Sequence, residues 1–236
     1  MEYLIPTQTT EDSLRRQVRT AVLPIGSFEQ HGPYLPLATD TIIACLITNA
    51  IANSYLVQHL PPISIACSHE HSSWPGTVSI SASTLYSVIF DIHKSLQQSG
   101  VPNLVLINAH GGNYVLRNIV QEATIATPCM ALFPTNEDWA SARVAAGLTT
   151  TDHEDMHAGE LETSILLHAQ QDLVRSGYTT GDHIANERSA ILTLGMKAYS
   201  ASGVIGRPSL ASAAKGKELL ASLVNSFADC LAQLSE

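Results

Sequence analysis

The chain has 236 residues, a formal net charge of −9 and 45% hydrophobic residues. This length is sufficient for one domain with a well-buried core. The excess of acidic residues argues against DNA or RNA as the main partner, because phosphate binding relies on clustered Lys and Arg.

The sequence shows neither a recognisable targeting signal nor a cysteine motif, and we therefore expect a cytoplasmic protein. The N-terminal stretch MEYLIPTQTTEDSLRRQV has no basic segment followed by a long apolar run, as a secretory signal would have. No window offers the ~18 uncharged apolar residues of a membrane span. The four cysteines include no CxxC pair, so neither a zinc ribbon nor a disulfide framework is indicated.

Hydrophobic periodicity predicts strands and helices that alternate along the chain. In chain order we expect strand 19–26, helix 39–56, strand 61–68, helix 81–100, strand 103–108, helix 113–126, strand 129–134 and helices 159–174 and 212–234. Such alternation predicts a single α/β domain over residues 1–236. Its architecture would be a three-layer α/β/α sandwich with a mostly parallel central sheet.

Polar stretches follow the first three predicted strands. SFEQHGPYLPLATD (27–40) follows the first strand, SHEHSSWPGT (68–77) the second, and AHGGN (109–113) the third. Sites in open parallel sheets form beyond the carboxyl ends of the strands. We therefore expect these three loops to line one pocket.

The residue types in these loops are those that bind metal. Glu29, His31 and Asp40 lie in the first loop with no Lys or Arg among them, and His110 lies in the third. A fifth position, His157, stands in DMHAGELETS. Histidine and carboxylate without cysteine suit a catalytic zinc or manganese site.

Other readings stay open for two of these motifs. HGGN is also compatible with a Gly-rich turn or a phosphate cradle, although no Walker lysine or GxGxxG motif accompanies it. His69 and His71 are either structural or face the ligands and substrate.

Taken together, the stretches GSFEQHGPYLPLATD, EHSSWPGTVS, NAHGGN and HAGELETS resemble the creatininase family of amidohydrolases. They run in the family's order and span residues 26 to 164. The resemblance implies an α/β/α fold, two divalent metal ions per subunit and hydrolysis of a C–N bond in a cyclic or linear amide. It also implies a ring-like homo-oligomer, often a hexamer.

The resemblance assigns roles to individual residues. Glu29 and His31 match ligands of one metal each, Asp40 the carboxylate that bridges both metals, and His110 a further ligand. His157 matches the catalytic histidine. Candidates for substrate binding are Ser72, Trp74, Gly111, Gly112 and Asn113. Trp74 could instead be a core residue. Gly111, Gly112 and Asn113 could instead cap the helix that follows them.

One position departs from the family pattern. Creatininase has a carboxylate ligand two residues after the position of His110, where this chain has Gly112. We infer that Glu160 replaces it from another loop, with Glu162 as the alternative. If Glu160 is the ligand, Glu162 is expected to orient His157 for catalysis.

Charge balance is consistent with this ligand set. Two divalent cations carry four positive charges, while Glu29, Asp40 and Glu160 together with a bridging hydroxide supply four negative charges. A neutral site suits a dry pocket, because unpaired buried charge is costly. We expect Zn²⁺, with Mn²⁺ as the alternative at one position, and a hydroxide activated by the two metals as the nucleophile.

The substrate is the least determined feature. We expect a small or cyclic amide, such as a lactam, a formamide or a creatinine-like molecule, in a pocket shaped by segment 135–156 and Trp139. The alternatives are a peptidase that matures a ribosomally made peptide cofactor or natural product, and a hydrolytically inactive metal-binding scaffold for biosynthesis. No nucleic acid or membrane partner is expected, and the assembly expected is a homohexamer.

Overall fold

The computed structural model describes residues 5–234 and has one parallel sheet at its centre. The strand order is β2-β1-β3-β4, and each neighbouring pair is parallel. The strands are β1 (Thr20–Ile25), β2 (Gln58–His59), β3 (Asn103–Asn108) and β4 (Met130–Phe133).

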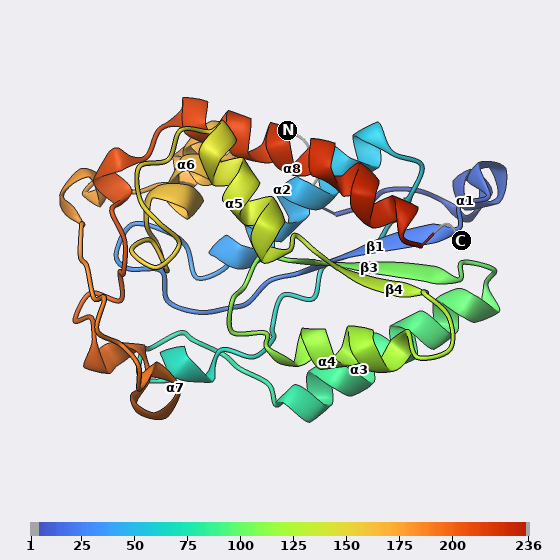
Figure 1. The fold of residues 1–236 in the computed structure, drawn as a ribbon, viewed down its shortest axis with the longest axis horizontal. Helices are drawn as coiled ribbons and strands as arrows, with labels where there is room; N and C mark the ends of the chain where they lie inside the picture. Colours follow the sequence, from blue (N-terminus) through green and yellow to red (C-terminus); the bar gives the residue numbers. More distant parts are fainter. Residues whose placement is uncertain (1–4, 235–236) are drawn as a thin grey trace.

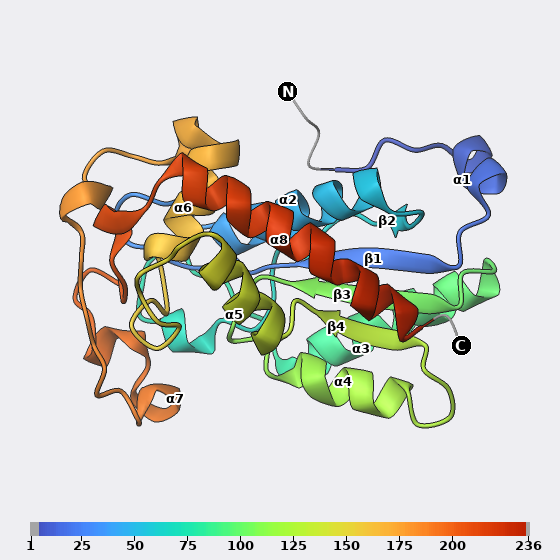
Figure 2. The same ribbon diagram turned by 45° about the horizontal axis from the view of Figure 1, so that its top comes forward.

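Helices cover both faces of this sheet, so the predicted three-layer α/β/α fold is confirmed (Figures 1 and 2). One layer contains α2 (Thr39–Ser54), α5 (Asn136–Ala145), α6 (Glu160–Ala169) and α8 (Ala213–Ala232). The other contains α3 (Ala82–Gln98) and α4 (Val115–Ala123). Two short helices, α1 (Thr10–Arg16) and α7 (Ile191–Leu194), lie at the periphery.

Strand β3 shows why the sheet is covered on both faces. Successive side chains of a strand point to opposite faces. Val105 and Ile107 pack in the core beneath α2 and α8, whereas Leu104 and Leu106 pack in the core beneath α3 and α4. All four side chains are fully buried, which matches the continuous apolar run that predicts a central parallel strand. Within residues 5–234, no helix has both the length and the apolar character needed to cross a bilayer.

The prediction of a regular strand over residues 61–68 was wrong. Only Gln58 and His59 form β2, and the following segment meets β1 at a single bridge between Ile25 and Ile63. Pro61 and Pro62 stand at the start of the predicted strand, and proline has no N–H to donate to a ladder. The segment therefore runs beside β1 without pairing along its length.

Helix α5 was also not predicted from the pattern. It begins inside segment 135–156 with a capping box, in which the Thr135 hydroxyl accepts from the Asp138 N–H and the Asp138 carboxylate accepts from the Thr135 N–H. One residue of the helix, Ala142, is buried, so its hydrophobic periodicity is weak. The local capping signal is stronger than the periodic one here.

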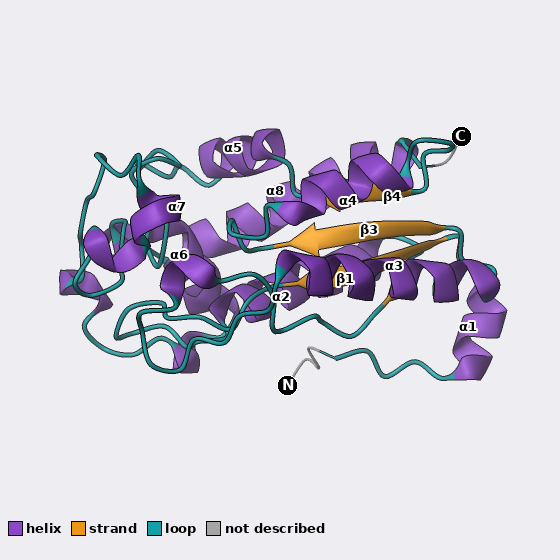
Figure 3. Ribbon diagram, turned by 90° about the horizontal axis from the view of Figure 1, so that it is seen from below, coloured by secondary structure: helices purple, strands orange, loops and turns teal. Residues whose placement is uncertain are grey.

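The side chain of Asn113 joins three loops at the carboxyl edge of the sheet. Its Oδ1 accepts from the Cys67 N–H at 3.1 Å, and its Nδ2 donates to the Gly26 carbonyl at 3.2 Å and to Asn108 Oδ1 at 3.0 Å. Figure 3 shows β3 pointing toward this edge, on the side of α6 and α7. The amide that was expected to contact substrate is thus bonded within the protein.

Helix α6 is held close to α8 by a glycine. A Cβ atom at Gly216 would lie 2.0 Å from the carbonyl oxygen of Ser164, so the two backbones approach more closely than any side chain permits. Because α6 begins at Glu160 and also carries Glu162, this contact fixes where both acids lie.

We predict that Gly216→Ala destabilises the protein. Separating α6 from α8 should lower the free energy of unfolding by about 1–3 kcal/mol, although alanine gains up to ~1 kcal/mol in helix propensity. Urea unfolding measures the change. Asn225→Ala, on the exposed face of the same helix, is the control and should change stability by less than ~0.5 kcal/mol. Equal stability of Gly216→Ala and the control would contradict the close packing.

Candidate metal and catalytic site

Glu29 is a buried carboxylate whose two oxygens accept no hydrogen bond from residues 5–234. Its side chain is 0% exposed, and the nearest nitrogens are His71 Nε2 and His110 Nε2, each at 3.2 Å but outside hydrogen-bond geometry. A buried acceptor without a donor is costly, and a buried charge without a partner more so. The residues present therefore fit a cation at this point.

Asp40, the second residue of α2, lies between two imidazoles from different loops. Its Oδ1 is 2.9 Å from His31 Nε2, and its Oδ2 is 3.0 Å from His110 Nδ1. The Ser27 hydroxyl also donates to Oδ2 at 2.6 Å. Asp40 thus connects the loop after β1 with the loop after β3.

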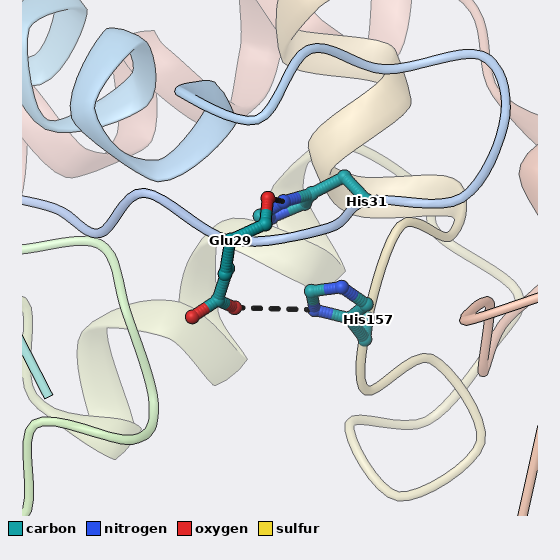
Figure 4. Close-up of side chains that lie close together, drawn as sticks. All are labelled: Glu29, His31 and His157. Atoms are coloured by element: carbon teal, nitrogen blue, oxygen red, sulfur yellow. Dashed lines mark hydrogen bonds and ion pairs between the residues drawn. The ribbon is translucent and has the colours of Figure 1, made fainter. Parts of the chain in front are cut away.

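Backbone carbonyls orient both of these imidazoles. The Nδ1 of His31 is 3.1 Å from the Glu29 carbonyl oxygen (Figure 4), and the Nε2 of His110 is 2.8 Å from the Cys67 carbonyl oxygen. A carbonyl oxygen can only accept, so these nitrogens carry the hydrogens. The opposite nitrogens, both facing Asp40, are left to bind a metal.

The structure places the two acids of α6 differently from what we expected. Glu162 faces the site, with Oε2 4.0 Å from His31 Nε2 and 2.6 Å from the Ala158 N–H. Glu160 faces away from it: its carboxylate forms an ion pair with Lys215 and accepts from the Thr150 hydroxyl at 2.6 Å. The geometry therefore favours Glu162, the alternative, over Glu160 as the ligand.

Acids and imidazoles fall into overlapping groups that could each hold a cation. One group is Glu29, Asp40 and His110, and a second is His31, Asp40 and Glu162, with ligand atoms within 4.8 Å of one another in each. The two groups share Asp40. Mixed oxygen and imidazole donors suit Zn²⁺ or Mn²⁺, so the residues present fit a pair of divalent ions. A third group combines Glu29 and His31 with His157.

In the absence of cations, protons neutralise two of these acids, Glu29 and Glu162, whereas Asp40 stays ionised beside the imidazoles of His31 and His110, which outweigh burial and hold its pKa well below its usual range. Burial raises the pKa of Glu29 and that of Glu162 to about 7. For His31, burial lowers the pKa, but attraction to Asp40 outweighs it and raises the pKa to about 10. For His110, attraction to Glu29 and Asp40 outweighs burial in the same way and gives a pKa of about 10.

His157 has the opposite character. Its Nε2–H donates to the Gln30 carbonyl at 2.6 Å, which leaves the Nδ1 lone pair 3.8 Å from Glu29 Oε1 (Figure 4). Burial, and then repulsion from His31 and His71, hold the pKa of His157 well below its usual range. The low pKa keeps the imidazole neutral and lowers its proton affinity, so what supports a role in proton transfer is the placement of the free lone pair toward a metal-binding carboxylate. Gln30, rather than Glu162, holds this ring.

A strained turn fixes the backbone next to His157. Ala158 has a φ of 53°, a left-handed conformation that is uncommon outside glycine. The Tyr34 hydroxyl donates to the Ala158 carbonyl at 2.8 Å, and the Ala158 N–H donates to Glu162. The turn thus couples the positions of His157 and Glu162.

A cavity of about 250 Å³ opens over these groups, and a larger one of about 540 Å³ adjoins it. The smaller cavity is lined by Glu29, Asp40, His71, His110, His157 and Glu162, among others. The two share Ala109, His110, Gly111, Tyr114, Met156 and Glu162. Residues of segment 135–156, including Trp139, line the larger cavity, as the sequence predicted.

Gly112 leaves space for an acid that sequence reasoning missed. A Cβ atom at Gly112 would lie 2.1 Å from Glu70 Oε1 and 2.4 Å from His110 Nε2. Glu70 Oε1 is 3.6 Å from His110 Nε2, so a carboxylate reaches His110 from the loop after β2. The only signal in the sequence was the position of Glu70 between His69 and His71.

The remaining substrate-binding candidates are divided. Gly111 lines both cavities. Ser72 lines a third cavity, of about 370 Å³, which shares Glu70, Gly112, Tyr114 and Leu192 with the 250 Å³ cavity. The ring of Trp74 has the Lys197 ammonium 5.8 Å from its centroid. Ser72 and Trp74 are not among the residues that line the 250 Å³ cavity.

The α/β/α fold, with buried acids and imidazoles at the carboxyl edge of its sheet, defines a metal-dependent hydrolase. Residues 6–231 match the family model for creatininase, described as creatinine amidohydrolase. The chain belongs to the creatininase family.

Relatives of this chain include peptidases. It is 32% identical over 240 residues to the mycofactocin precursor peptide peptidase of Mycobacterium ulcerans (strain Agy99), covering 96% of this chain and 89% of that protein. Identity to the protein of the same name from Mycolicibacterium smegmatis (strain ATCC 700084 / mc(2)155) is 30% over 234 residues, with 94% and 87% covered. Creatinine amidohydrolase of Pseudomonas putida is 25% identical over 171 residues, 65% of each chain.

Solved creatininases share the fold. A crystal structure of creatinine amidohydrolase aligns with a TM-score of 0.82 at 23% identity, covering 98% of this chain and 97% of that chain. A structure described as the manganese form of creatininase gives 0.79 at 23% identity, covering 98% of each.

We predict different outcomes for the two acids of α6. Glu162→Gln should weaken divalent-metal binding by more than about tenfold, because tenfold is the smallest effect usual for losing even an outer partner of a metal site. Glu160→Gln should leave the metal affinity unchanged. It should instead lower the free energy of unfolding by about 3 kcal/mol, because it leaves Lys215 without its buried partner. Competition with a chelating dye and urea unfolding measure the two quantities. The reversed pattern would return the ligand role to Glu160.

We also predict that metal binding releases protons. The raised pKa values of Glu29 and Glu162 stabilise the protonated, metal-free fold at low pH, and this contribution is lost as pH rises through about 7. Cations compete with these protons and with those of His31 and His110, whose pKa is about 10, so stabilisation by Zn²⁺ should grow as pH rises through about 7 and continue to grow toward about pH 10. Calorimetry in buffers of different ionisation enthalpy counts the protons. Binding without proton release and with no pH dependence would contradict the prediction.

Proposed function

We propose that this protein hydrolyses an amide C–N bond, with two divalent cations held by Glu29, His31, Asp40, His110 and Glu162. Zn²⁺ is the first choice and Mn²⁺ the alternative. The observation that carries the proposal is the buried Glu29 carboxylate, neither of whose oxygens accepts a hydrogen bond from residues 5–234 and whose Oε1 lies 3.8 Å from His157 Nδ1. The Glu29 carboxylate, which has no Lys or Arg partner among those residues, thus lies beside the imidazole of His157 in the 250 Å³ cavity.

The cations, when bound, lower the pKa of a water molecule and polarise the substrate carbonyl. The chain's own residues manage the proton. His157 Nδ1 accepts it as the water oxygen adds to the carbonyl carbon, and returns it to the nitrogen as the C–N bond breaks. The Gln30 carbonyl holds the Nε2–H of the same ring, so the transfer uses one nitrogen throughout.

For the substrate we favour a peptide bond. Two relatives that match over most of this chain are named as precursor peptide peptidases. The 540 Å³ cavity that continues from the site offers room for residues flanking the cleaved bond. Peptide maturation, the alternative in the sequence analysis, therefore has more support than the small-amide preference.

A small or cyclic amide remains the second candidate. The cavity of about 250 Å³ over the ligands is large enough for such a molecule, and Pseudomonas putida creatinine amidohydrolase is a relative. A hydrolytically inactive scaffold has less support, because the base at His157 and the acids at Glu29 and Asp40 are all present. Homohexameric assembly and cytoplasmic location stay predictions from the sequence.

We predict that the zinc- or manganese-loaded protein cleaves short peptides in a panel that also contains creatinine, lactams, hydantoins and formamides. His157→Gln should lower kcat by about 10²–10⁴-fold, the usual cost of losing a general acid–base, while elemental analysis still finds two metals. His168→Gln, an exposed histidine on α6, is the matched control.

Two outcomes would decide against parts of this proposal. Turnover of small amides with no peptide cleaved would exclude the peptide substrate and leave the hydrolytic site intact. Full metal occupancy with no turnover of any compound in the panel would favour the inactive scaffold.

A further inference from the structure

Gln30 lies in the sequence between two of the predicted ligands, Glu29 and His31. Its backbone and side-chain polar groups all contact other polar groups of the protein. It is 5% exposed. Its backbone N–H donates to the Thr77 hydroxyl at 3.2 Å, and its side-chain Oε1 accepts from the Gly32 N–H at 2.9 Å. Its Nε2 lies 2.9 Å from His71 Nδ1, 3.1 Å from the Gly203 carbonyl and 3.2 Å from His157 Nε2.

A glycine makes space for the side chain of Gln30. Gly203 has a φ of 88°, and a Cβ atom there would lie 1.7 Å from Gln30 Oε1. Any other residue at 203 would thus be strained and would collide with the amide. The backbone of the 200–206 segment is shaped around Gln30.

Counting hydrogens assigns the proton of His71. The Gln30 Nε2 group has two hydrogens and cannot accept. One hydrogen goes to the Gly203 carbonyl, which cannot donate. His157 Nε2 cannot take the other, because it carries a hydrogen itself and donates it to the Gln30 carbonyl at 2.6 Å. The second hydrogen therefore goes to His71 Nδ1. A ring nitrogen that accepts carries no hydrogen, so the hydrogen of the His71 ring is on Nε2.

The two histidines thus present opposite groups to the same place. His71 Nε2–H is 3.2 Å from Glu29 Oε1, and the bare Nδ1 of His157 is 3.8 Å from the same oxygen. Figure 4 shows the approach of His157 to Glu29. The centroids of the two rings are 4.5 Å apart, and both residues line the 250 Å³ cavity.

We propose that His71 is a second catalytic histidine, a hydrogen-bond donor opposite the acceptor His157, and that Gln30 is the positioning residue that sets this polarity. The inference rests on the proposed hydrolysis. A donor is needed where negative charge develops on the carbonyl oxygen under attack, and the preorganised N–H of the buried His71 supplies it. His71 keeps its proton, so His157 alone transfers one.

Neutron crystallography of the zinc-loaded protein tests the polarity directly, whether or not a substrate is known. Wild-type crystals should show a deuteron on Nε2 of both His71 and His157. In Gln30→Glu the ionised side chain can only accept, so the deuteron of His71 should move to Nδ1. The deuteron of His157 should stay, because its partner is the backbone carbonyl of residue 30. A deuteron on His71 Nδ1 in the wild type, or no movement in the variant, would overturn the role of Gln30.

Kinetics on the substrate found in the panel test the role of His71. His71→Gln keeps an N–H near the position of Nε2, whereas His71→Asn keeps only the group that meets Gln30. We expect kcat to fall about 10²-fold or more in His71→Asn, the cost of one lost donor, and to be largely preserved in His71→Gln. The kcat of Gln30→Glu should fall as much as that of His71→Asn. Gln97→Glu, at an exposed position of α3, is the control and should have the kcat of the wild type.

Metal content separates this proposal from a structural explanation. All four variants should retain two zinc ions per chain by elemental analysis. Loss of metal from His71→Asn, or equal kcat in His71→Gln and His71→Asn, would overturn the donor role. If Gln30→Glu does not fold, the comparison of the two His71 variants still decides. Absence of turnover in the wild type would count against the proposed function, and the deuteron positions would still test the polarity.

Discussion

The buried charge of Glu29 is the constraint around which the rest of the site is organised. Within residues 5–234, no Lys or Arg lines the 250 Å³ cavity; Arg143, in the lining of the adjoining cavity, pairs with Asp155 at 3.1 Å, and Lys215 pairs with Glu160. The acids of the cavity are thereby left to imidazoles and to exchangeable ions. Because a lysine or arginine inside the cavity would neutralise Glu29 permanently, its exclusion keeps the site open to metal.

The scaffold meets this constraint by collecting short loops at one edge of a parallel sheet. No single segment contains enough ligands, so the loop after β1, the loop after β3 and the start of α6 must be held in register. The Asn113 amide binds the first two together with the loop after β2, and the turn at Ala158 and the contact of α6 with α8 hold the third. The strain at Ala158 is of the kind found at functional sites.

The sequence was informative where the chemistry is local and uninformative where it depends on distant packing. The strands at 20–25 and 103–108 follow from apolar runs, and Glu29, His31 and Asp40 from one motif. The choice between Glu160 and Glu162 could not be made, because two residues apart on a helix means about 200° around its axis. Which acid faces the cavity depends on Lys215, which is contributed by α8. Gln30 was overlooked because successive side chains of an extended segment point in opposite directions, so Gln30 points away from Glu29 and His31. Its hydrogen-bond partners, His71 and Gly203, are distant in the sequence.

The loops joined by Asn113 have a consequence for how such enzymes diversify. Three of the loops around the metal ligands share one amide, so a change in any of them disturbs the others and the ligands with them. Other lining residues, among them Glu137, Trp139, Ile191 and Leu192, supply no member of the two ligand groups that share Asp40. Substitutions at such positions change what the cavities accept without removing a ligand. One reaction can thereby be turned to new substrates through the lining residues that hold neither a ligand nor the Asn113 junction.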